Sequence, residues 1–154
     1  LEVYSSTYAH VWNDFARALP TSVDFILFDG SLLHHPLNDM MKNYHVSQKQ
    51  ALTHIVALLE ALGSVRRSIV YLTADNPEEQ LKAARNARGQ RAPSNEEIAF
   101  WNARFQMDQF ILNQISENIR TLNISGNGWE RQRSRILREL TLPEKIRFAQ
   151  GEKM

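Results

Sequence analysis

The stretch IVYLTADNPEEQLKAARNARGQR, residues 69–91, decides how the rest of the chain is interpreted. Its first residues form a short apolar run, which is typical of a buried β-strand. Asn76, Pro77 and the two glutamates that follow indicate a helix start, because Asn caps free N–H groups, Pro fits the first turn and carboxylates favour the positive end of the helix dipole. The helix is predicted to run to about Arg88, with Gly89 just past its end. The stretch therefore predicts a strand that leads directly into a helix.

Two more stretches are predicted to be strands. Residues 23–30 (VDFILFDG) are almost continuously apolar, as in a central strand covered on both faces of a parallel sheet. Residues 120–125 (RTLNIS) alternate between apolar and polar. Helical patterns separate these strands, and strands that alternate with helices favour a parallel sheet with right-handed crossovers. We therefore expect one α/β domain over residues 1–154, a three-layer parallel sheet with helices on both faces. Because three strands make a small sheet, we also expect a further strand upstream of Leu1.

Composition excludes several classes of protein. The chain has 154 residues, 43% of them hydrophobic and 23% charged, which is ordinary for one globular domain. The net charge of +1 gives no strong attraction to nucleic acid or to a membrane surface. There is no cysteine, so a disulfide scaffold, a thiolate nucleophile and a Cys-ligated metal are excluded. No apolar run is long enough to cross a bilayer and no signal peptide is evident, so we expect a cytoplasmic protein.

Asp29 and Gly30 are the first candidate site residues. Ligands of open α/β sheets bind beyond the carboxyl ends of the strands, and Asp29 is predicted to lie there. An acid after an apolar strand resembles a Walker B strand, whose carboxylate holds Mg²⁺ directly or through water. The alternative is that Asp29 and Gly30 simply form the turn that closes the strand.

Three arginines near the end of the predicted helix are the second candidate set: Arg85, Arg88 and Arg91. Guanidinium forks match phosphate oxygens and neutralise charge during phosphoryl transfer. The alternative is that they are ordinary solvated cations, which are favoured at helix C-termini.

The run from the strand through Asn76, Pro77 and Arg88-Gly89 to Arg91 resembles the segment before and through the lid of P-loop nucleoside and nucleotide kinases, with the deoxynucleoside kinase and thymidylate kinase group nearest. The resemblance implies a P-loop-kinase-like fold with a lid at about residues 85–95. It also implies ATP and Mg²⁺ as cofactors. Asp29, Arg85, Arg88 and Arg91 would be catalytic, Gly30 and Arg88 would contact the cofactor, and Asp29 would hold the metal.

The sequence departs from this family in two places. No G-x-x-x-x-G-K-[ST] motif occurs, and the glycines around residue 127 lack the Lys and hydroxyl residue of a phosphate loop. Gly-Ser follows Asp29, where many of these kinases carry Arg. The family's phosphate loop lies at the N-terminus, so we expect it upstream of Leu1.

Our leading hypothesis is ATP-dependent phosphoryl transfer to a small-molecule acceptor such as a nucleoside or nucleotide. The alternative is a non-catalytic P-loop-like domain that binds a nucleotide or a partner. We expect neither a membrane nor nucleic acid as a partner, although an arginine-rich helix over residues 129–140 leaves a nucleic-acid reading as a third hypothesis, and a homodimer remains open. His34 and His35 fall where they can face a substrate, but surface or packing roles are favoured for all five histidines, since adjacent histidines rarely chelate one metal.

Overall fold

The computed structural model describes residues 1–23, 25–125 and 129–139. Within them the fold is mixed α/β, with six helices and a two-stranded parallel sheet. The elements follow in the order α1 (Glu2–Ala18), α2 (His34–Asn43), α3 (Gln48–Ala61), β1 (Ile69–Thr73), α4 (Pro77–Ala87), α5 (Asn95–Leu112), β2 (Ile119–Asn123) and α6 (Trp129–Glu139). None of the helices in these described ranges is both long enough and apolar enough to cross a membrane.

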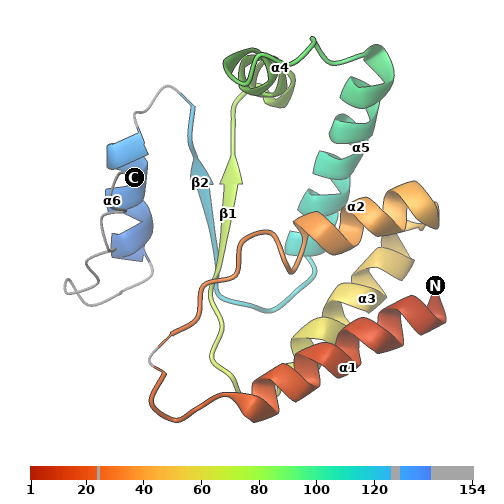
Figure 1. The fold of residues 1–154 in the computed structure, drawn as a ribbon, viewed down its shortest axis with the longest axis vertical. Coiled ribbons are helices and arrows are strands. Elements are labelled where there is room, and N and C mark those ends of the chain that lie inside the picture. The colour runs from red at the N-terminus through yellow and green to blue at the C-terminus, as the bar shows by residue number, and fades with distance from the viewer. Residues whose placement is uncertain (24, 126–128, 140–154) are drawn as a thin grey trace.

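The two strands confirm two of the three predicted ones. β1 and β2 pair in parallel, with Ile69 opposite Ile119 and Thr73 opposite Asn123. The chain between them forms α4 and α5, so the pair is joined by a helical crossover, as parallel strands require. Figure 1 shows α4 just beyond the carboxyl end of β1 and α5 running back toward the other helices. The candidate site described in the next subsection lies where β1 ends and α4 begins.

Three helices begin at side-chain caps, and the cap at Asn76 was predicted from the sequence. The Ser47 hydroxyl accepts from the Gln50 N–H at the start of α3, and the Asn76 side chain accepts from the Glu79 N–H at the start of α4. Ser94 and Glu97 form a reciprocal capping box on α5. Local side-chain chemistry fixes these helix starts, which explains why the sequence predicted the start at Asn76.

α5 ends at Leu112, although apolar residues at helical spacing continue as far as Ile119. Ile119 belongs to β2, where it pairs with Ile69. The apolar spacing continues past the helix because Ile115 packs against the core cluster from the connecting segment. Spacing alone does not distinguish a helical residue from a neighbour buried by the same core.

The predicted strand at residues 23–30 is wrong in the described part of that segment. Phe25, Ile26, Leu27 and Phe28 form no strand and are 42–79% exposed. Phe28 stacks on Trp12 of α1 at 5.6 Å between ring centroids, so the segment rests on α1 rather than within a sheet. A strand needs a neighbour to pair its N–H and C=O groups, and the described sheet contains only β1 and β2.

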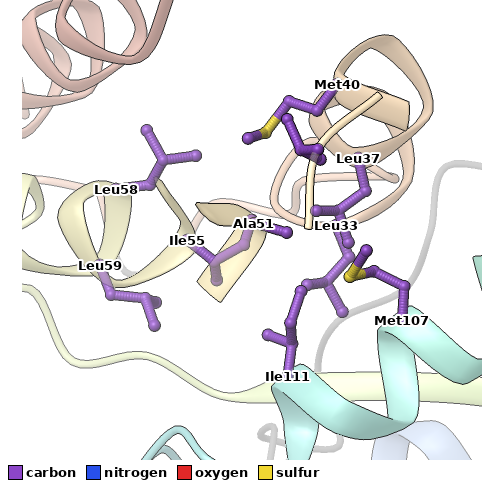
Figure 2. Packing of buried hydrophobic residues seen from close by; sticks show 10 residues of the cluster. Leu33, Leu37, Met40, Ala51, Ile55, Leu58, Leu59, Met107 and Ile111 are labelled. Carbon is purple, nitrogen blue, oxygen red and sulfur yellow. The ribbon is translucent and has the colours of Figure 1, made fainter. Parts of the chain in front are cut away.

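The apolar core lies among three helices. Figure 2 shows side chains of α2, α3 and α5 pointing toward one another. Leu37, Ile55, Leu58 and Ile111 are completely buried. α1 has no fully buried residue and covers α3 from outside through its tyrosines and Trp12. The core thus fixes α5, and α5 supplies one wall of the site described below.

We predict that Leu58→Ala lowers the free energy of unfolding by about 3 kcal/mol, because it removes buried methyl groups and leaves a cavity. Leu27→Ala is the matched control and should change it by less than about 0.5 kcal/mol, since Leu27 is 79% exposed. Urea unfolding followed by circular dichroism measures both values. Equal losses would show that residues 25–28 are covered in solution.

Candidate functional site

A cleft of about 340 Å³ opens at the carboxyl end of β1. This volume is within the usual range of small-molecule sites, and its position matches the general location of ligands in α/β sheets. Its lining comes from five places in the chain: His34; Tyr71, Leu72, Thr73 and Ala74; Pro77, Gln80, Leu81 and Ala84; Trp101, Arg104, Phe105 and Asp108; and, from just past β2, Ile124. Most of these side chains are apolar or aromatic, with a few polar groups among them.

The cleft has an inner and an outer end. At the inner end, the Tyr71 hydroxyl of β1 donates to Asp108 Oδ2 of α5 at 3.1 Å. At the outer end, Arg85 of α4 pairs with Glu97 of α5 at 2.5 Å. α4 and α5 are therefore joined by an ion pair outside the cleft lining, whereas β1 and α5 are joined by residues that line it.

The floor is a buried charge network centred on Arg104. Its Nη1 donates to Asp108 Oδ2 at 2.8 Å, and its Nη2 donates to the Leu33 carbonyl at 2.8 Å. The Arg104 and Asp108 side chains are only 4% and 7% exposed. The network joins α5 to β1 and to the residue just before α2, so it fixes three parts of the cleft relative to one another.

Burial dominates the titration of this network. Burial raises the pKa of Asp108 to about 6, although the Arg104 charge and the hydrogen bond from Tyr71 both act to lower it. Burial also lowers the pKa of Arg104 and raises that of Tyr71. A carboxyl group that titrates close to neutral pH inside a cleft is a common property of functional sites.

His34 forms one side of the cleft. Its ring stacks on Trp101 with 5.7 Å between centroids and 16° between planes, and one ring nitrogen lies 3.3 Å from Asn38 Nδ2. Partial burial of the ring lowers the pKa of His34, and the nearby charge of Arg104 lowers it further. The imidazole is thus held neutral near pH 7 and offers a flat face beside Trp101.

Asp29 lies in the turn before α2, outside the cleft lining and not at the end of a strand as predicted. It is exposed, and its charge acts on His34. Gly30 follows with φ +68°, and a Cβ there would lie 3.1 Å from His35 Nε2. Only glycine adopts this turn without strain, so Gly30 holds Asp29 beside His34.

The three predicted arginines differ in their partners. Arg85 and Arg91 both pair with Glu97, at 2.5 and 3.4 Å. Arg88 is exposed and donates to Gln90 Oε1 at 3.3 Å, and no carboxylate of the described residues pairs with it. Arg88 follows Ala84 by one helical turn, so it continues the face of α4 that lines the cleft. None of the three arginines lines the cleft, and Arg88 is the one that continues its lining face.

Sequence reasoning did not single out Arg104 or Asp108. The signal was present, because both lie at one-turn spacing on the same apolar face as Trp101 and Phe105. A charged pair on the buried face of a helix requires a polar partner elsewhere in the fold. Across residues 1–23, 25–125 and 129–139, no group of three His, Asp or Glu side chains forms a ready metal site.

We predict that the free energy of unfolding of the wild type, measured relative to Asp108→Asn, falls as the pH rises from about 4 to about 6 and is flat above that range. The folded state holds the Asp108 proton more tightly than the unfolded chain, so this contribution is present at low pH and is lost as the folded protein loses that proton. Urea titrations of both proteins at several pH values measure the difference. A difference that rises with pH would show that Arg104 keeps the carboxylate ionised.

No protein-family model matches the chain, and neither curated proteins nor solved structures give a significant match.

Proposed function

We propose that the cleft binds a nucleoside or nucleotide and that the protein carries out ATP-dependent phosphoryl transfer to it. The observation that supports this proposal is the position of the cleft at the carboxyl end of β1, with an α4 wall that leads to Arg88. In this proposal the two strands belong to a larger three-layer, P-loop-kinase-like sheet. A further strand and its phosphate loop would complete the ATP site.

Arg88 is suited to a phosphate group. Its guanidinium is exposed and engages only the neutral Gln90 side chain among the described residues. A planar guanidinium can bond two phosphate oxygens at once and stays charged at any physiological pH. A ligand with its ring in the apolar part of the cleft would extend its phosphate along α4 toward this side chain.

Asp29 is suited to Mg²⁺ held partly by phosphate and water. Mg²⁺ usually takes only one or two carboxylates from a protein and keeps several waters. The exposed carboxylate of Asp29, held by the Gly30 turn near His34, fits that limited role. Bound Mg²⁺ would neutralise phosphate charge during transfer.

Arg85 and Arg91 have a positioning role in this proposal. Through Glu97 they hold the end of α4, the segment of residues 88–94 and the start of α5 together, which is the region that resembles a kinase lid. Both pairs are partly or largely exposed, so each contributes little stability and can exchange Glu97 for phosphate.

A second candidate function is nucleotide binding with no turnover. The pairing of two of the three arginines with Glu97 favours it, because a paired guanidinium carries less free charge for a transferring phosphoryl group. The two candidates share the cleft and differ only in chemistry.

We predict that Arg88→Ala weakens the binding of nucleoside 5′-monophosphates by at least about 10-fold, since a charged hydrogen bond to phosphate is worth roughly 1.5–3 kcal/mol. Isothermal titration calorimetry measures the affinities. Arg66→Ala is the matched control, because Arg66 is also exposed but lies outside the cleft lining. Equal affinity of both variants would remove Arg88 from the site.

In a chain that includes the expected phosphate loop, and with ATP, Mg²⁺ and a nucleoside or nucleotide acceptor, Asp29→Ala and Arg88→Ala should each reduce phosphoryl transfer by about 100-fold or more, with the fold preserved. Transfer of radiolabelled phosphate measures the rate. Wild-type binding without transfer would support the second candidate, and turnover equal to wild type in both variants would remove the site assignment.

A further inference from the structure

The Arg104–Asp108 pair leaves two of its polar atoms without partners. Asp108 Oδ1 and Arg104 Nε are buried, and neither forms a hydrogen bond within the described residues. A buried polar atom without a partner typically costs about 1–3 kcal/mol, and more when it is charged. Native proteins leave few such atoms, and each one calls for an explanation.

Both residues line the inner end of the cleft. Their other atoms are occupied, since Arg104 Nη1 and the Tyr71 hydroxyl both donate to Asp108 Oδ2 and Arg104 Nη2 donates to the Leu33 carbonyl. These bonds restrain both side chains, apart from the last torsion of Asp108. What remains is one N–H donor and one carboxylate acceptor on adjoining side chains.

This remaining pair suits an uncharged polar edge. Arg104 and Asp108 carry opposite charges 2.8 Å apart, so together they attract a phosphate far less than Arg88 does. The walls beside them include the flat rings of Trp101 and Phe105. Rotation about the last torsion of Asp108, which is soft for a carboxylate, would turn its free oxygen toward a ligand.

We propose that Arg104 and Asp108 recognise a planar nitrogen heterocycle by the neighbouring acceptor and donor on its ring edge, with Arg104 Nε–H donating to the acceptor and Asp108 Oδ1 accepting from the donor. This inference rests on the proposed function, and it assigns the ring to the inner end of the cleft and the phosphate to the Arg88 end. It adds two binding residues that the kinase resemblance did not indicate. The two unpaired atoms gain partners only when the ligand is bound.

Two matched pairs of probes test the inference. They are uridine 5′-monophosphate with its N3-methyl derivative, and adenosine 5′-monophosphate with its N6,N6-dimethyl derivative. In each pair methylation removes the ring-edge donor and keeps the phosphate. Isothermal titration calorimetry should show that methylation weakens the binding of at least one parent nucleotide to the wild type by about 10-fold or more.

Variants assign this loss to the floor residues. Asp108→Asn can offer its amide N–H where the carboxylate accepted a hydrogen bond. It should weaken the binding of the parent nucleotide about 10-fold and reduce the effect of methylation on binding to less than about 3-fold. Arg104→Lys keeps a cation opposite Asp108 but lacks Nε, and it should also weaken the binding of the parent nucleotide. Glu78→Gln is the control, because Glu78 belongs to an exposed ion pair with Lys82, also at one-turn spacing, and lies outside the cleft lining. It should bind as the wild type does.

Several outcomes would overturn the inference. If the parent nucleotides bind and methylation has no effect, a bridging water rather than a ligand satisfies the two atoms, and the proposed function still stands. The inference also fails, and the proposed function still stands, if methylation weakens nucleotide binding to the wild type and to Asp108→Asn equally. If a variant fails to fold by circular dichroism, the comparison of the probes on the wild type decides alone. If neither parent binds the wild type, this inference fails together with the proposed function.

Discussion

The Arg104 guanidinium fixes the geometry on which the cleft depends. It contacts Asp108 on its own helix and the Leu33 carbonyl 71 residues away, and Asp108 in turn accepts from Tyr71 of β1. A buried charge that loses its partner destabilises a protein strongly, so α5 cannot slide along β1 or away from the start of α2 without a large cost. The apolar core alone would tolerate such a shift more easily, because apolar contact is not directional.

The two ends of the cleft are held with very different strength. At the outer end, Glu97 caps α5 through Ser94 and pairs with Arg85 and Arg91, but these groups are between 23% and 73% exposed. Exposed ion pairs contribute about 0–1 kcal/mol each, whereas the inner pair is almost fully buried. α4 can therefore move relative to α5 at the outer end while the floor stays in place.

The sequence was most informative where structure is local. Ser47, Asn76 and Ser94 cap helices through bonds to residues only three positions away, so their patterns could be recognised directly. Residues 23–30 were misassigned because an apolar run predicts that a segment packs against other residues, but it does not show whether those residues belong to a sheet or to a helix. Arg104 and Asp108 were missed for a similar reason: their partners Leu33 and Tyr71 are distant in sequence, and only the charged pair on an apolar helix face hinted at them.

The structure places Asp29 and Arg88 differently from the arrangement that the sequence predicted. The sequence suggested that strand ends would deliver both to one edge of a sheet. Instead Asp29 approaches from the turn at Gly30, beside His34, while Arg88 extends from the end of α4. His34 and α4 both line the same cleft, but Asp29 and Arg88 themselves lie outside its lining and on separate segments of the chain. Phosphoryl transfer works mainly through positioning of the reacting groups. In this fold, such positioning would require the outer end of α4 to move toward the fixed floor, because the site is not rigidly formed in advance.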